Sequence, residues 1–179
     1  MLTDKSIVLR APEPADIDLL YEWENNTLFW KVSGTLAPFS RHVLEHYILS
    51  ASQDIHSARQ VRFMIGLTSK EKTIGCIDLF DYDPLHRRAG VGILIADQTE
   101  QRNGYASSAL ELLIDYAFGN LKLNQLYCNV AEGNLASLNL FHKFGFQNSG
   151  VKKQWINEGN SWKDELFLQL LREDSSASE

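Results

Sequence analysis

The chain has 179 residues, of which 44% are hydrophobic and 22% are charged, and this balance predicts a folded globular domain with its own core. Its formal net charge of −6 argues against nucleic acid as the main ligand, because nucleic-acid-binding surfaces are usually basic. The N-terminus lacks the basic and apolar regions of a signal peptide, and no apolar run approaches the length of a membrane span. We therefore expect a protein without a membrane partner.

The two cysteines, Cys76 and Cys128, both lie in apolar runs that look like strands. Neither has the spacing of a metal site or of a disulfide framework, so we expect buried thiols in a reducing compartment. The chain is accordingly expected to be cytoplasmic.

Helical and extended patterns alternate along the chain. Apolar residues that recur every three or four positions predict helices, and alternating or continuous runs of branched apolar residues predict strands. The expected elements, in chain order, are a strand at 7–10, a helix ending near 24, a helix at 41–50, strands at 61–67, 73–80 and 91–96, a helix at 105–119, a strand at 125–131, a helix at 136–144, and strands at 151–156 and 165–171.

This order predicts an α+β (α/β) fold with a mixed, mostly antiparallel sheet of about seven strands flanked by about four helices. No repeat, linker or change of composition divides the chain, so residues 1–179 are expected to form a single domain. Residues 172–179 are polar and lack an apolar anchor, and they are expected to fray.

The join between the strand at 91–96 and the following helix has features of an anion site. The first N–H groups of a helix have no partner within it, and the helix dipole adds positive potential there. Gly104 has no side chain and Ala106 has only a methyl group, so an anion can approach this backbone closely. The join lacks the Gly-Lys-Ser/Thr ending of a nucleotide-hydrolase phosphate loop, and an ordinary strand-to-helix turn is the alternative.

Two segments resemble signatures of the GCN5-related N-acetyltransferases, the GNAT superfamily. Gln101-Arg102-Asn103-Gly104-Tyr105-Ala106 resembles the Gln/Arg-x-x-Gly-x-Gly/Ala signature. A second match to the superfamily lies downstream, at Val130, Asn134, Ser137 and Lys143-Phe144-Gly145-Phe146. The likeness covers residues 7–171 and is nearest to the branch of spermidine acetyltransferases and ribosomal-protein N-terminal acetyltransferases. It implies the GNAT fold and an acetyltransferase activity.

The resemblance also implies acetyl-CoA as the acetyl donor and no metal. In the superfamily, the strands on either side of the phosphate-binding helix splay apart and hold the pantetheine arm. The implied cofactor-binding residues are the backbone of Ile93, Leu94 and Ile95 for pantetheine, the N–H groups of Arg102, Asn103, Gly104, Tyr105 and Ala106 for the pyrophosphate, and the side chains of Asn134, Ser137 and Lys143 for the arm. A helix cap is a second role for Asn134, and the two roles are compatible.

The reaction implied is attack of a primary amine on the thioester, which needs a proton acceptor because an alkylamine with a pKa near ~10.4 is protonated at neutral pH. Asp78 is the candidate, since its position resembles that of an acidic residue in the spermidine branch. Glu22 and Glu24 are candidates for holding a cationic acceptor, and Trp30 for a wall of the acceptor pocket. Solvated carboxylates and an aromatic core are the alternatives.

Two departures from the superfamily bear on the acceptor. Phe141 stands where many relatives have a Tyr that protonates the departing thiolate, and Gly90 stands where the spermidine branch has a Glu. We therefore expect a protein N-terminus as acceptor, with a polyamine or another small amine second. A sensor or assembly module that binds CoA without turnover is the alternative of another class.

Two further patterns carry weaker expectations. His42-Val43-Leu44-Glu45-His46 matches a short zinc pattern, but no third ligand is marked and no metal site is expected. Trp155 and Trp162 flank the last expected turn, where packing or a homo-oligomer contact is expected.

Overall fold

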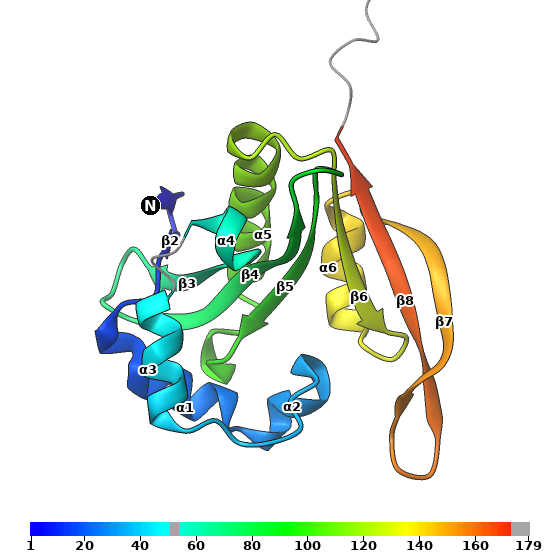
Figure 1. The fold of residues 1–179 in the computed structure, drawn as a ribbon, viewed down its shortest axis with the longest axis horizontal. Helices are drawn as coiled ribbons and strands as arrows, with labels where there is room; N and C mark the ends of the chain where they lie inside the picture. Colours follow the sequence, from blue (N-terminus) through cyan, green and yellow to red (C-terminus); the bar gives the residue numbers. More distant parts are fainter. Residues whose placement is uncertain (51–53, 173–179) are drawn as a thin grey trace, which may run out of the picture.

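A computed structural model describes residues 1–50 and 54–172 of the chain, and these form one continuous sheet flanked by helices (Figure 1). The sheet has eight strands in the order β1-β2-β3-β4-β5-β6-β8-β7. The strands are β1 (Leu2–Thr3), β2 (Ile7–Arg10), β3 (Val61–Leu67), β4 (Thr73–Asp83), β5 (Arg88–Ile95), β6 (Gln125–Ala131), β7 (Gln147–Asn157) and β8 (Trp162–Leu171). All neighbours pair antiparallel except β5 and β6, which are parallel.

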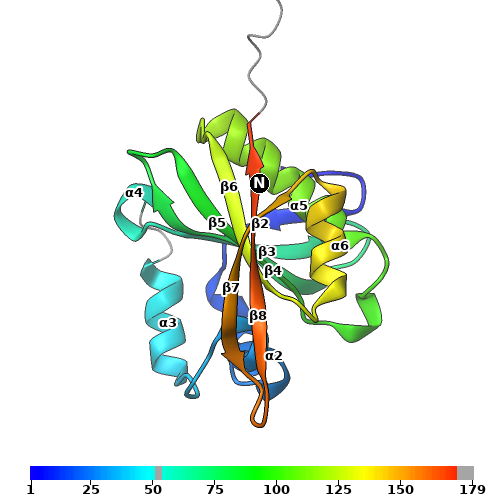
Figure 2. The ribbon, with the colours of Figure 1, turned by 90° about the vertical axis from the view of Figure 1, so that its right-hand side faces the viewer.

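The helices cover both faces of this sheet. They are α1 (Ile17–Glu24), α2 (Thr27–Ser33), α3 (Arg41–Ser50), α4 (Ile55–Ala58), α5 (Tyr105–Asp115) and α6 (Leu135–Lys143). Figure 2 shows α3 and α4 on one side of the sheet and α5 and α6 on the other. A π-helical turn, Tyr116–Asn120, continues the chain directly after the last residue of α5. None of the described helices is long and apolar enough to cross a membrane.

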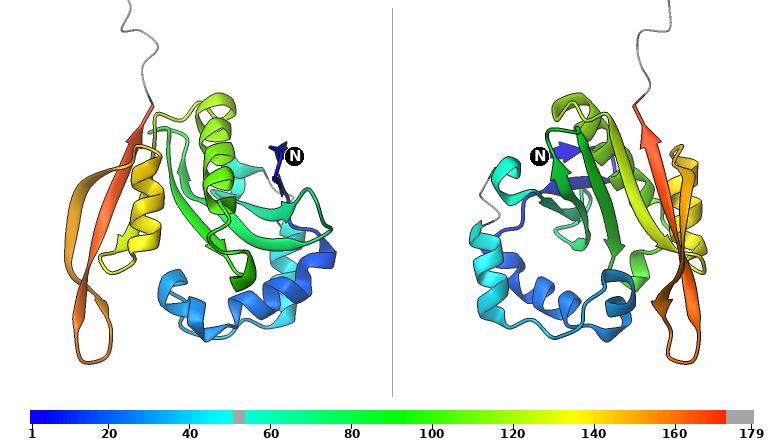
Figure 3. Two further views of the ribbon diagram at one scale, coloured as in Figure 1. Left: turned by 180° about the vertical axis from the view of Figure 1, so that it is seen from behind. Right: turned by 45° about the vertical axis from the view of Figure 1, so that its right-hand side comes forward.

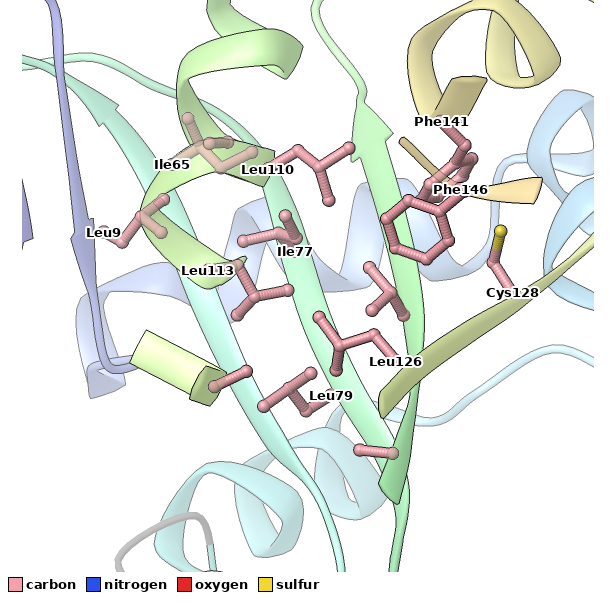
Figure 4. Close-up of a cluster of buried hydrophobic side chains, with 14 of the residues drawn as sticks. Leu9, Ile65, Ile77, Leu79, Leu110, Leu113, Leu126, Cys128, Phe141 and Phe146 are labelled. Carbon is pink, nitrogen blue, oxygen red and sulfur yellow. The ribbon is translucent and has the colours of Figure 1, made fainter. Parts of the chain in front are cut away.

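The main core lies between the sheet and α5. Alternate residues of the strands point toward this helix, as a strand's period of two requires, and meet its apolar stripe (Figure 4). Leu110 and Leu113 of α5 and Ile77 of β4 are fully buried in this layer. Cys128 is buried there too, and Cys76 is buried against α1 and α3, so the prediction of buried thiols is confirmed. Burial raises the pKa of each thiol to about 12.

The predicted α+β class and mostly antiparallel sheet are confirmed, with one strand and two helices more than expected. The extra strand, β1, has two residues.

Helix α2 was not predicted because Asn25-Asn26 looks like a helix terminator. In the structure Asn25 ends α1, and the side chain of Asn26 caps α2 by accepting a hydrogen bond from the Leu28 N–H at 3.0 Å. The prediction of a frayed end falls on 172–179, of which 173–179 lie outside the described residues.

An ion pair fastens the first long strand to α1. The Arg10 guanidinium donates to both carboxylate oxygens of Asp16, at 2.6 and 2.7 Å, and to the Thr73 hydroxyl at 2.9 Å. The Asp16 side chain is only 5% exposed. Burial raises the pKa of Asp16, but hydrogen bonds from Arg10 and from the Glu13 N–H outweigh it, so that the pKa lies below its ordinary value.

Candidate active site

The parallel pairing of β5 and β6 ends early, and the two strands then separate. Only Arg88–Gly90 pairs with Gln125–Tyr127. Beyond Gly90, β5 continues to Ile95 paired with β4 alone, and β6 continues paired with β8 alone (Figures 1 and 3). The edge of β5 from Val91 to Ile95 therefore offers peptide N–H and C=O groups that have no partner strand on the β6 side. An extended ligand with amide groups can satisfy them.

The loop between β5 and α5 is held by polar contacts. Gln101 Nε2 donates to the Ile95 carbonyl at 3.0 Å. Lys72, from the turn between β3 and β4, reaches Asp97 at 2.7 Å and Glu100 at 3.0 Å. The hydrogen bond from Lys72 lowers the pKa of Asp97 to about 2. A single cation thus offsets two carboxylates that precede the predicted pyrophosphate-binding loop.

The N-terminus of α5 is open, as an anion site requires. Gly104 is its N-cap residue, no side chain caps it, and φ of Gly104 is +87°, in the left-handed region that favours glycine. Apart from its two chain neighbours, no described residue has a heavy atom within 4 Å of the place where a Cβ on Gly104 would stand. Arg102, at φ +64°, and Asn103 are exposed beside it, and Tyr105 and Ala106 begin the helix.

The C-terminal end of α6 lies near this end of α5. The Lys143 ammonium donates to the Ser107 hydroxyl in the first turn of α5 at 3.3 Å, so a cation stands beside the uncapped N–H groups. Asn134 caps α6 by accepting from the Ser137 N–H at 3.2 Å, which leaves its amide NH₂ to donate to a ligand. An unpaired strand edge, an uncapped helix N-terminus and a nearby cation fit the pantetheine and pyrophosphate of acetyl-CoA.

A cavity of about 310 Å³ lies on the opposite face of the sheet, between α1, α3 and the strands β3 and β4. Arg62, Glu24 and Asp78 are its charged lining residues. The Arg62 guanidinium donates to both oxygens of Asp78, at 2.8 and 2.9 Å, and to Glu24 at 2.5 Å. Asp78 is opposite Gly92 in the β4–β5 register and is therefore close to the point where β5 and β6 part.

The charges of this cavity largely offset one another. Burial lowers the pKa of Arg62, but the charges and hydrogen bonds of Asp78 and its other neighbours outweigh it, so that the pKa rises above its ordinary value. Arg62 is thus always charged, and with Glu24 and Asp78 the lining carries a formal charge of −1. The Tyr47 ring lies 5.4 Å from the Arg62 Cζ, and burial raises the pKa of its phenol to about 12.

The other candidate acceptor residues lie differently. Glu22 is exposed and does not line the cavity, nor does Trp30. The Trp30 indole N–H donates to the Glu24 carbonyl at 2.8 Å, which anchors α2 to the end of α1. Arg62 was not among the site residues predicted from the sequence. A lone arginine in the apolar strand Val61–Leu67 does, however, indicate that a carboxylate pairs with it, because a buried charge needs a partner.

A second cavity, of about 620 Å³, lies over β6 and β8 on the same face. Its lining is polar and of mixed charge and includes Asp81, Arg88 and Lys152. The Tyr127 hydroxyl donates to Asp81 at 3.2 Å. Burial and the neighbouring Asp81 carboxylate raise the pKa of Tyr127 to about 12.

The other side chains singled out from the sequence, Phe141, His42, His46, Trp155 and Trp162, line neither cavity. Phe141 is 3% exposed and packs against Phe146 in the core (Figure 4). The rings of His42 and His46 meet edge to face, and the described residues contain no group of three or more histidines, cysteines or carboxylates that could hold a metal. Trp155 and Trp162 are 60% and 57% exposed, so they do not pack in the core, and an oligomer contact stays a prediction.

Comparisons with known proteins identify the family. Residues 6–147 match the family described as Acetyltransferase (GNAT) domain. The chain is 26% identical to a probable N-acetyltransferase YjcK of Bacillus subtilis, over 97% of this chain and 98% of that protein. It is 27% identical to a spermidine N(1)-acetyltransferase of Vibrio cholerae, over 86% of this chain and 87% of that protein.

A solved structure has the same fold. The spermidine N-acetyltransferase of Vibrio cholerae, in complex with CoA and spermine, aligns with a TM-score of 0.83 at 24% identity, over 94% of this chain and 96% of that chain. The family match and the relatives named as N-acetyltransferases define an acetyltransferase. The chain belongs to the GNAT family, and it is an N-acetyltransferase whose acetyl donor is acetyl-CoA.

Proposed function

We propose that this enzyme acetylates the N-terminal amine of a protein. The observation that carries the proposal is the position of Arg62 between Glu24 and Asp78. A polyamine carries several positive charges and needs several unpaired carboxylates. Here the Arg62 guanidinium already pairs with both carboxylates of the cavity, Glu24 and Asp78. The lining keeps a net negative charge that suits one ammonium group.

The pKa of the acceptor also favours an N-terminus. An α-amine has a pKa of about 8, so its deprotonation at pH 7 costs about 1.4 kcal/mol. A side-chain or polyamine amine near ~10.4 costs about 4–5 kcal/mol. An N-terminal amine therefore demands less of the proton acceptor than a side-chain or polyamine amine does.

In the proposed mechanism, acetyl-CoA extends along the open edge of β5, with its pyrophosphate at the residues 102–106. The acceptor nitrogen, once deprotonated, attacks the thioester carbonyl carbon, and the C–S bond then breaks. Asp78 accepts the proton of the amine, directly or through water, with the lone pairs that Arg62 leaves unused. The CoA thiolate takes a proton from water, because a thiol with a pKa near ~8.5 is a tolerable leaving group without an assisting acid.

Acetylation of a polyamine is the second candidate, supported by the relative named as a spermidine N(1)-acetyltransferase and by the two carboxylates of the cavity. The test is release of free CoA from acetyl-CoA, followed with a thiol reagent, across spermidine, spermine, lysine, and peptides that start with Ala, Ser or Thr. Peptides whose N-terminus is already acetylated are the matched control. We expect a kcat/KM at least about tenfold higher for the free peptides than for either polyamine.

Preference for spermidine or spermine would refute the N-terminal proposal. If no acceptor released CoA although calorimetry detected bound acetyl-CoA, a CoA-binding module without turnover would be supported instead.

A further inference from the structure

A phenylalanine ring lies against two glycines of β5 at the point where β5 and β6 separate. Phe80 on β4 is opposite Gly90 in the antiparallel register, and Gly90 is opposite Tyr127 in the last pair of β5 and β6. A Cβ added to Gly90 would stand 2.3 Å from Cε2 and 2.5 Å from Cζ of Phe80. At Gly92 the same addition would stand 3.8 Å from Cε1 of that ring.

The ring and Gly90 therefore exclude any side chain at position 90. Contacts under 3.0 Å to a Cβ do not occur in proteins, so even alanine at 90 requires Phe80 to move. Phe80 has little freedom to do so, because its ring also meets the Tyr127 ring edge to face, with 6.0 Å between their centroids. Tyr127 in turn packs on Phe167, with 5.4 Å between centroids.

The ring and its aromatic neighbour each border a cavity. Phe80 lines the smaller cavity with Asp78, and its neighbour Tyr127 lines the larger one. Because Gly90 and Gly92 carry no side chains, the surface that an acceptor meets here is the aromatic ring itself. The smaller cavity, at about 310 Å³, is at the low end of ligand-binding cavities, so a fixed wall leaves little room beside a reacting amine.

We propose that Phe80, seated on Gly90 and Gly92, is the wall that sets how large a group the acceptor can carry next to its amine. For the N-terminal acceptors of the proposed function, on which this inference rests, the enzyme selects small first residues such as Ala, Ser or Thr and discriminates against Leu and Phe.

The test compares kcat/KM for peptides that differ only in their first residue, Ser, Ala, Leu or Phe. In the Phe80→Ala enzyme the ratio of the Leu peptide to the Ser peptide should rise at least tenfold over the unmodified enzyme, with an unchanged KM for acetyl-CoA. Phe63→Ala is the matched control, since Phe63 packs against Tyr116 on the α5 side of the neighbouring strand and its loss should leave the ratio unchanged.

Thermal stability tests the contact between Phe80 and Gly90 separately. Gly90→Ala should lower Tm, and Phe80→Ala should remove most of that effect in the double variant, because the ring that the new methyl group would meet is gone. If Phe80→Ala rescues Gly90→Ala but leaves the Leu-to-Ser ratio unchanged, the ring only packs and the proposal is wrong.

Failure of the proposed function would look different. An unmodified enzyme that acetylates polyamines but no peptide would refute the N-terminal acceptor. The wall would then be tested with primary amines of increasing bulk at the carbon beside the nitrogen. Phe80→Ala should improve the bulkiest of them at least tenfold over the least bulky, and an unchanged ranking would overturn the proposal.

Discussion

Arg62 holds Asp78 through two parallel hydrogen bonds, from Nε at 2.8 Å and from Nη2 at 2.9 Å. Paired in this way, a guanidinium fixes the plane of a carboxylate and leaves each of its oxygens a lone pair. The pair therefore orients the proposed proton acceptor, while Arg62 also reaches Glu24 across the cavity.

The first prediction concerns Asp78→Asn. An amide keeps the size of the side chain but cannot accept the amine proton, so kcat should fall by about 10²–10⁴-fold, with little change in the affinity for acetyl-CoA. Steady-state kinetics with a peptide acceptor, together with calorimetry of acetyl-CoA, measures both. Glu45→Gln, an exposed carboxylate on α3, is the control and should leave both values unchanged. Undiminished turnover in Asp78→Asn would end its assignment as the base.

The second prediction concerns Gly104→Val. The φ of Gly104 is +87°, which a β-branched residue adopts only with strain, and its side chain would enter the open space before the α5 N–H groups. The dissociation constant of acetyl-CoA should rise at least about tenfold. Gly119→Val, in the π-helical turn at the far end of α5, is the matched control because that position also faces open space. Equal affinities for the two variants would place the pyrophosphate elsewhere.

The third prediction concerns Lys72, which bridges Asp97 and Glu100 just before the residues 102–106. Without this cation the two carboxylates would repel the pyrophosphate and the loop would lose its tie to the β3–β4 turn. Lys72→Met should weaken acetyl-CoA by about three- to tenfold, since charges this close to solvent are partly screened.

A shorter acetyl donor tests whether Lys72 acts through the pyrophosphate. S-acetylpantetheine lacks the pyrophosphate, so its KM should be the same for Lys72→Met and the unmodified enzyme. Lys70→Met, an exposed lysine of the same turn, is the control variant. A similar loss with both donors would show that Lys72 acts on folding and not on the phosphate site.

The fourth prediction concerns the ion pair of Arg10 and Asp16. Asp16→Asn leaves Arg10 without its charged partner in a largely buried place, and should lower the free energy of unfolding by about 2–3 kcal/mol at pH 7. For a chain of this length that corresponds to a Tm lower by about 4–12 °C.

The pH dependence of this effect follows from the lowered pKa of Asp16. A carboxylate whose pKa is lower in the folded state stabilises the fold above its unfolded pKa of about 3.9, and this stabilisation is lost as the pH falls through the folded pKa. The difference in Tm between Asp16→Asn and the unmodified protein should therefore be constant near neutral pH and shrink below about pH 4. A difference that grows on acidification would contradict the assignment.

Much of the fold follows from local patterns in the sequence. Branched apolar runs mark the strands, and the apolar stripe at Leu110 and Leu113 marks α5, because both elements bury one regular face. The two short helices were missed because α2 starts directly after the Asn pair that ends α1, and α4 is a single turn capped by Asp54. Such elements depend on side-chain caps and on their neighbours rather than on a long periodicity.

Part of the candidate site could likewise be predicted from the sequence, and part could not. The open N-terminus of α5 and the position of Gly104 could be predicted, because they depend on the local chain. The pairing of Arg62 with Asp78 and the seat of Phe80 on Gly90 could not, since each depends on the register between neighbouring strands. The sequence singled out Gly90 as a departure from the resemblance, and the structure supplies a reason: the Phe80 ring fills its space.

The central claim is tested most directly by competition. The enzyme is given acetyl-CoA with equal concentrations of spermidine and a peptide that starts with Ser, and mass spectrometry identifies which amine carries the acetyl group. The account predicts acetylation of the peptide α-amine, with spermidine almost unmodified. Acetylation mainly of spermidine would contradict it and would show that Glu24 and Asp78 bind a polycation despite Arg62.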